Sequence, residues 1–168
     1  MNILIESVGI EEKEIIRNLL ELDSYDSSYY DKKDVNNFGL YGYKYLDHYW
    51  TDNNRFVYLV KMDNKIAGFT MISKWQYYKE IESDYCISEF FILNKYRKLG
   101  IGRYVVKYIL NKYKGKWQIG YDPRNIIGKE FWNNVIKEIT NNNFEKIVND
   151  QTHKYSDGVY GEVLIFEI

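Results

Sequence analysis

The chain has 168 residues, 45% of them apolar, and its composition does not change abruptly along its length. This size and apolar content predict one globular domain, residues 1–168, with a sizeable core. Lysine and arginine (23) nearly balance aspartate and glutamate (24), so the formal charge is only -1 and no broad electrostatic field favours nucleic acid or an anionic membrane. We therefore expect neither a nucleic-acid partner nor a membrane partner.

The amino-terminal segment MNILIESVGIEEKE has too short an apolar run for a signal peptide, and no stretch approaches the ~20 apolar residues of a membrane span. We expect a cytoplasmic protein. Cys86 is the single cysteine, which excludes an internal disulfide and a cysteine cluster for zinc, and a buried thiol is a simpler interpretation than a nucleophile. His48 and His153 have no metal-ligand spacing, so we expect both to pack in the core or at the surface, and we expect no metal.

A strand and then a helix are predicted at the start of the chain. Residues 3–8 (ILIESV) alternate apolar and polar side chains, which is typical of a half-buried strand. Residues 11–22 (EEKEIIRNLLEL) place Ile15, Leu19 and Leu22 on one face of a helix.

The next segment, residues 26–50, is rich in Asp, Ser, Asn and aromatic residues and has little clear periodicity. We expect irregular structure there, with a short helix near residues 43–49, and a segment of this kind can shape a pocket. Several of its aromatic rings could bind a substrate cation, although packing is the stronger expectation for any one of them: Tyr29, Tyr30, Tyr41, Tyr43 and Tyr45.

Three strands are predicted next. Residues 55–62 and 65–73 are strand-like runs joined across Asp63 and Asn64, a pair that suits a tight turn, so they form an antiparallel hairpin. Residues 84–93 (DYCISEFFIL) form the following strand.

The remaining elements alternate between helix and strand. We expect a helix over residues 103–113, a short buried strand over residues 116–121, and closing strands at 144–148 and 160–168 around the polar loop 149–158.

A second amphipathic helix follows the strand at residues 116–121. Asp122 can cap it and Pro123 fits its first turn. Apolar residues then recur every fourth position: Ile127, Phe131, Val135 and Ile139.

The stretch RKLGIG, residues 97–102, lies where the strand ending at residue 93 gives way to a helix. A helix amino terminus exposes unpaired N–H groups and a partial positive charge, and glycine lets backbone approach an anion closely, so this turn suits a diphosphate. The alternative is a turn that merely needs unusual backbone angles. Val105 stands where a dinucleotide fingerprint needs its third glycine, and the stretch does not match a nucleotide P-loop.

The order of elements, the turn and the later string N-x-x-G-x-x-F-W resemble the GNAT acyltransferase superfamily, whose signature is Arg or Gln, x, x, Gly, x, Gly or Ala. The resemblance covers essentially the whole chain. It implies an α/β (α+β) fold with a mixed, mostly antiparallel sheet of about six to seven strands flanked by helices. It also implies acetyl-CoA as co-substrate and an amine as acceptor.

The resemblance further implies which residues hold the cofactor. The backbone amides of the turn would bind the pyrophosphate: Arg97, Lys98, Leu99, Gly100, Ile101, Gly102 and Arg103. Backbone groups at the end of the preceding strand would pair with the pantetheine arm: Phe91, Ile92 and Leu93. On the later helix one residue would meet the cofactor and two would line its thioester end: Asn125, then Phe131 and Trp132.

An alkyl amine with a pKa of about 10.4 is neutral in only about one molecule in 2,500 at pH 7, a handicap of roughly 4.6 kcal/mol, so a base is useful. Glu89 is the carboxylate beside the predicted turn, and its aromatic neighbours would raise its pKa by desolvation. We predict that Glu89 is the base. The alternative is that strand alternation leaves Glu89 on a polar face without a role.

Trp132 stands where many members of the superfamily have a tyrosine that protonates the leaving thiolate, and Gly128 replaces a common alanine. Two functions therefore remain open: an N-acetyltransferase that acts on a small-molecule or protein amine, and a CoA-binding sensor or interaction module with little or no activity. The sequence is compatible with a homodimer but does not determine the oligomeric state.

Overall fold

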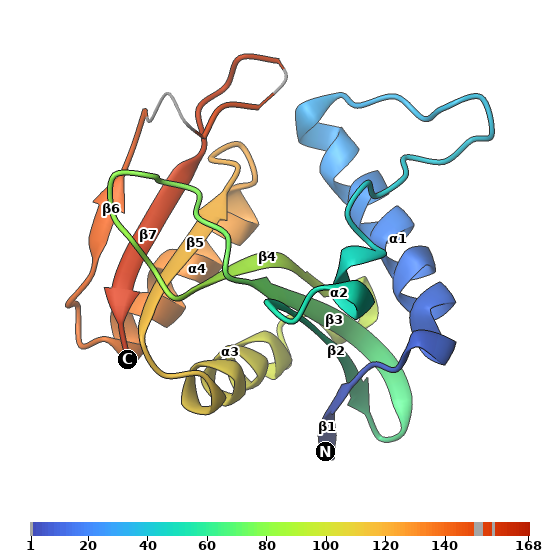
Figure 1. Ribbon diagram of the computed structural model, residues 1–168, viewed down its shortest axis with the longest axis horizontal. Coiled ribbons are helices and arrows are strands. Elements are labelled where there is room, and N and C mark those ends of the chain that lie inside the picture. The colour runs from blue at the N-terminus through green and yellow to red at the C-terminus, as the bar shows by residue number, and fades with distance from the viewer. Residues whose placement is uncertain (1, 150–152, 156) are drawn as a thin grey trace. The chain divides into compact units, whose positions relative to one another are not determined.

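The computed structural model describes residues 2–149, 153–155 and 157–168 (Figure 1). Within these residues the strands form a seven-stranded sheet in the order β1-β2-β3-β4-β5-β7-β6. The pair β4–β5 is parallel, whereas β1–β2, β5–β7 and β6–β7 are antiparallel. This mixed, mostly antiparallel sheet with flanking helices confirms the predicted fold class.

The chain divides into two compact units. The first contains Met1–Ile72 and Glu89–Ile101, and the second contains Ser73–Ser88 and Gly102–Ile168.

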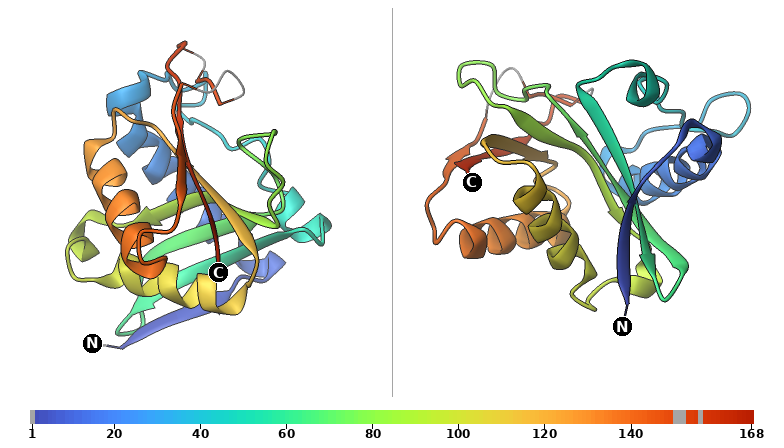
Figure 2. Two further views of the ribbon diagram at one scale, coloured as in Figure 1. Left: turned by 90° about the vertical axis from the view of Figure 1, so that its left-hand side faces the viewer. Right: turned by 60° about the horizontal axis from the view of Figure 1, so that its bottom comes forward.

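The first unit contains two helices and the amino-terminal strands, with β4 belonging to it from Glu89 onward. Its elements are β1 (Ile3–Ser7), α1 (Lys13–Asp31), α2 (His48–Thr51), β2 (Arg55–Met62), β3 (Lys65–Ser73) and the end of β4 (Tyr85–Ile92). Both helices pack on one face of β2 and β3 (Figure 2). Apolar side chains from these four elements, from the loop before α2 and from β4 share one buried core: Ile16, Leu19, Leu20, Leu46, Tyr49, Val57, Leu59, Phe69, Met71 and Phe91.

Helix α1 differs from its prediction in length and in its buried face. It continues to Asp31 through residues that were expected to be irregular, and it ends where Lys32 turns left-handed at φ 56. Leu22, predicted inside, is 49% exposed, whereas Leu20 is buried. Leu20 and Leu22 are two residues apart and so lie about 200° apart around the helix, on nearly opposite faces, and packing against the sheet decides which face is buried.

The predicted hairpin is confirmed. β2 and β3 have the predicted bounds, and Asp63 (φ 49) and Asn64 (φ 63) are both left-handed, as a two-residue hairpin turn whose twist matches its strands requires.

The second unit contains the other helices and the carboxy-terminal strands. Its elements are α3 (Ile101–Lys112), β5 (Lys116–Tyr121), α4 (Ile126–Ile139), β6 (Glu145–Ile147) and β7 (Glu162–Glu167). Helix α4 is tied to its strands, because Lys129 donates to Glu162 of β7 at 2.7 Å and Asn133 donates to the Tyr121 hydroxyl of β5 at 2.7 Å. Cys86 is buried, as predicted, and burial raises the pKa of its thiol.

Helix α4 also differs from its prediction. Asn125, not Asp122, caps it, because the Asn125 side-chain oxygen accepts the Gly128 N–H at 2.9 Å. Ile127 is 64% exposed, and the buried residues are Trp132, Val135 and Ile136. Of the predicted loop 149–158, residues 150–152 and 156 lie outside the described residues.

Among the helices that the structure describes, none has the length and apolar character to cross a membrane.

Candidate active site

Glu89 lies on the inner face of β4, not on the solvent-facing one. Residues two apart on a strand share a face, and Phe91 packs in the core beneath α1 and α2, with its ring centroid 6.2 Å from that of Phe69. Glu89 is accordingly half-buried, and the Tyr43 hydroxyl, from the loop between α1 and α2, donates a hydrogen bond to its carboxylate. Strand alternation therefore does not leave this carboxylate on a solvent-facing polar face, and whether it has a role in catalysis stays a prediction.

Burial raises the pKa of Glu89 to about 7, against the hydrogen bond from Tyr43 and the positive charge of Lys33, which both lower it. Neutral pH therefore falls within the range over which this carboxyl group titrates. Burial and the negative charge of Glu89 also hold the Tyr43 hydroxyl in its protonated, donating form, because both raise its pKa. A carboxylate with a pKa near the ambient pH is well matched to accepting and releasing a proton.

A second carboxyl group faces Glu89 from α1. Burial raises the pKa of Asp23 well above its ordinary range, and the negative charges of Glu89 and Asp26 raise it further, opposed by Arg97. Sequence reasoning did not identify Asp23 or Asp26, because both lie in the part of the chain that was interpreted as the end of a helix and an irregular segment. It did single out Tyr43, but as a cation-binding ring and not as a partner of Glu89.

The Arg97 side chain points back into its own unit. Its Nε donates to the Ile92 carbonyl at 2.7 Å, and its Nη2 lies 2.5 Å from a carboxylate oxygen of Asp26 on α1. Its guanidinium also lies 5.4 Å from the centroid of the Phe91 ring. The side chain therefore fixes the end of β4 and the start of the turn, and a role for Arg97 in pyrophosphate binding remains a prediction for its backbone.

The turn after β4 has the backbone form expected of an anion site. Lys98 (φ 61) and Gly100 (φ 80) are left-handed, both are exposed, and α3 begins directly afterwards at Ile101. The first N–H groups of α3 have no carbonyl partner within the helix, and they include those of Gly102 and Arg103. Backbone donors, exposed glycine and a helix amino terminus together fit a diphosphate.

Some backbone groups predicted to bind pantetheine already have partners. The Leu93 N–H donates to the Ala67 carbonyl of β3 at 2.9 Å, and the Ile92 carbonyl accepts from Arg97. Because successive backbone groups of a strand point to opposite edges, Ile92 directs its N–H away from β3. Among the predicted pantetheine partners, the N–H of Ile92 is therefore the strongest candidate.

The predicted site residues of the second unit lie on or beside α4. Asn125 uses its side-chain oxygen as the helix cap. Trp132 is buried, and its ring meets that of Phe131 edge to face at 4.9 Å. Arg103 pairs with Glu138 at 2.5 Å.

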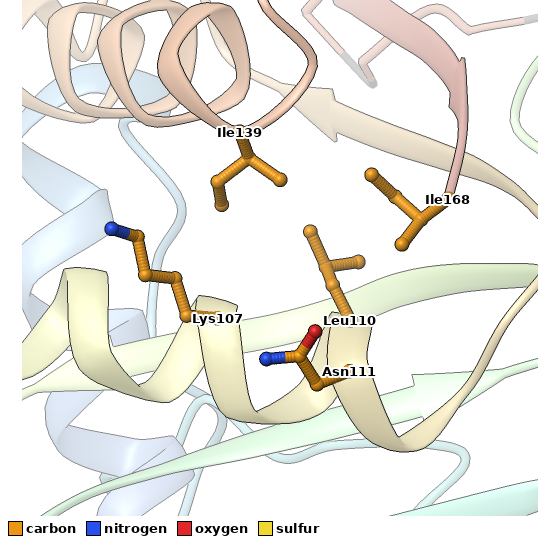
Figure 3. Close-up of a pocket in the computed structure, with 5 residues that line it drawn as sticks. All are labelled: Lys107, Leu110, Asn111, Ile139 and Ile168. Atoms are coloured by element: carbon orange, nitrogen blue, oxygen red, sulfur yellow. The ribbon is translucent and has the colours of Figure 1, made fainter.

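A pocket of about 240 Å³ in the second unit contains none of the predicted site residues. Figure 3 shows the apolar side chains of Leu110, Ile139 and Ile168 pointing toward one another in this pocket. Lys107 and Asn111 complete the lining, and the Lys107 amine is held by Glu138 at 2.8 Å. The pocket is therefore lined mainly by aliphatic side chains.

In the described part of the chain, no group of three or more His, Cys, Asp or Glu side chains is arranged to hold a metal ion. His48 is exposed near the Tyr45 ring, and the His153 ring lies tilted against the Tyr77 ring at 4.9 Å and the Tyr155 ring at 5.4 Å.

A model of the acetyltransferase (GNAT) family matches residues 19–127, which is more than half of the chain. The structure is similar to that of the ribosomal-protein-S18-alanine N-acetyltransferase from Escherichia coli, with a TM-score of 0.63 and 9% identity over 99% of this chain and 94% of the other. An acetyltransferase from Thermus thermophilus has a TM-score of 0.65 and 12% identity, covering 100% of this chain and 98% of the other. A GNAT-family acetyltransferase from Staphylococcus aureus has a TM-score of 0.63 and 14% identity, covering 99% of both chains. At such identities these likenesses show the fold, and none of the curated proteins compared with the chain matches it.

Proposed function

Because the chain belongs to the acetyltransferase (GNAT) family and is thus an acyltransferase, we propose that residues 1–168 act as one domain that transfers an acetyl group from acetyl-CoA directly to a primary amine. The amine belongs to a small molecule or to a protein. The observation that carries this proposal is the half-buried Glu89 carboxylate, which has a pKa of about 7 and accepts a hydrogen bond from Tyr43.

Glu89 acts as the general base. It takes a proton from the ammonium form of the acceptor, directly or through one water molecule, and leaves the amine nitrogen with a free electron pair. That nitrogen attacks the thioester carbon, the carbon–sulfur bond breaks, and the nitrogen loses one further proton to solvent or to the departing thiolate, so that the acetyl group remains on it as a neutral amide. The thiolate leaves without a perfectly placed acid, because a thiol has a pKa of about 8.5. Trp132, which has no titratable proton, is therefore compatible with turnover.

The turn at residues 97–103 binds the diphosphate of acetyl-CoA. Backbone N–H groups at the start of α3 bind its oxygens, while the left-handed Lys98 and Gly100 direct the chain so that these donors face outward. The backbone N–H of Ile92, which points away from β3, holds the pantetheine arm beside Glu89. A cofactor role for Asn125, Phe131 and Trp132 stays a prediction from the sequence.

The experiment that tests this function follows thiol release from acetyl-CoA with alkyl amines, polyamines, aminoglycosides and peptides. We expect turnover with at least one of these classes. On that acceptor, Glu89→Gln should reduce the rate about a hundredfold or more near pH 7, with little change in acetyl-CoA affinity. The difference in rate between Glu89→Gln and wild type should shrink as pH rises, because more of the amine is then already neutral. Equal rates for the two proteins at pH 7 would remove the base role from Glu89.

A further inference from the structure

A carboxylate on α1 holds the loop that leads to α2. Its two oxygens, on Glu21, accept consecutive backbone N–H groups, from Tyr41 at 2.7 Å and from Gly42 at 2.8 Å. A carboxylate that accepts two hydrogen bonds in this way fixes the orientation of the loop as well as its distance. Gly42 has φ 71, which glycine adopts without strain. The loop is therefore fixed immediately before Tyr43.

Tyr43 connects this fixed loop to Glu89. Its ring packs against the core of the first unit and lies edge to face with the Tyr45 ring at 6.3 Å. Its hydroxyl donates to the Glu89 carboxylate. A short chain of contacts thus connects a helix, a loop and the strand that carries the proposed base.

We propose that Glu21 and Tyr43 are positioning residues for the acetyl transfer: Glu21 fixes the loop so that the Tyr43 hydroxyl holds the Glu89 carboxylate in the orientation that accepts the amine proton. The inference rests on the proposed function for what Glu89 does. The positioning itself is a property of the protein without substrate and can be measured there.

The groups that face Glu89 are Asp23 on α1 and Lys33 and Tyr43 in the following loop. Burial disfavours a charged Glu89, whereas Tyr43 and Lys33 favour it, and the negative charge of Glu89 in turn raises the pKa of Asp23. Removing the Tyr43 hydroxyl should therefore raise the pKa of Glu89.

The first test is Tyr43→Phe, which removes the hydroxyl and keeps the ring. The titration of Glu89 is followed by carbon NMR in protein with labelled glutamate, and Glu89→Gln assigns the signal. A hydrogen bond to a charged group is worth more than about 1.4 kcal/mol, so the midpoint should rise by about one pH unit. The acid limb of the pH–rate profile should shift to higher pH by the same amount. Tyr45→Phe, the same change in the same loop, is the control and should leave the midpoint in place.

The second test is a double-mutant cycle. Glu21→Ala should raise the Glu89 midpoint in the same direction as Tyr43→Phe, and the double variant should show no further rise, because both changes break one connection. Glu14→Ala, which removes an exposed carboxylate of α1 that pairs with Arg17, is the control. Independent, additive shifts would mean that Glu21 does not act through Tyr43.

The two proposals fail in different ways. An unchanged Glu89 midpoint in folded Tyr43→Phe overturns the positioning, even where Glu89→Gln is inactive. If the Glu89 midpoint rises in Tyr43→Phe but Glu89→Gln is fully active, the base role is overturned and the positioning hydrogen bond is supported. Tyr43→Phe by itself decides the outcome for Tyr43 should Glu21→Ala not fold.

Discussion

Glu89→Gln should lower the rate of acetyl transfer but make the folded protein more stable above neutral pH. The folded protein holds the pKa of Glu89 at about 7, against an ordinary value of 4.5, because burial disfavours its charge. Between these two values the folded state binds more protons than the unfolded state, so stability falls as pH rises. The difference of about 2.5 units corresponds to an upper limit of roughly 3 kcal/mol once Glu89 is fully ionised. Gln is neutral at every pH and can still accept from Tyr43.

The assay is urea unfolding of wild type and Glu89→Gln from pH 4.5 to 8.5, followed by tryptophan fluorescence. Near pH 4.5 the two proteins should have similar free energies of unfolding, because Glu89 is then protonated in the folded state. Near pH 8.5 the variant should be more stable by about 1–3 kcal/mol, which for a chain of this size raises Tm by roughly 2–10 °C. Glu130→Gln, at an exposed position, should give no such trend. A variant that is equally or less stable at pH 8.5, or whose gain does not depend on pH, would refute the argument from burial.

Two further predictions concern the turn and its anchor. Gly100→Val and Gly102→Val should each weaken acetyl-CoA binding at least tenfold in calorimetry, but only Gly100→Val should also lower Tm, because Gly100 is left-handed whereas Gly102 lies in α3. Unchanged affinity in both variants would mean that the glycines merely form a turn. Arg97→Ala should lower the free energy of unfolding by about 1–3 kcal/mol, since it breaks the hydrogen bond to the Ile92 carbonyl and the pairing with Asp26, and it should weaken acetyl-CoA binding less than either valine. Lys98→Ala, at an exposed neighbour, is its control, and equal stability of the two variants in urea would contradict the anchoring role.

Local signals in the sequence determined the order of the elements and several of their bounds. The hairpin across Asp63 and Asn64 is an example, because the turn needs left-handed residues and its flanking runs alternate with period two. β5 also has its predicted bounds. The turn at residues 97–102 was found for the same reason, since glycine spacing at a strand-to-helix junction is a local pattern.

Tertiary structure decided what each of these elements buries and which side chains meet. The sequence pattern did not show that Leu20 is buried in place of Leu22, because that choice depends on how α1 lies on the sheet. Arg97 pairs with Asp26 across 71 positions of the chain, and no local period encodes such a contact. The carboxylate at position 89 could be named as a candidate base from its neighbours in the strand. Its pKa of about 7 and its hydrogen bond from Tyr43 exist because folding removes it from water and brings a distant loop against it.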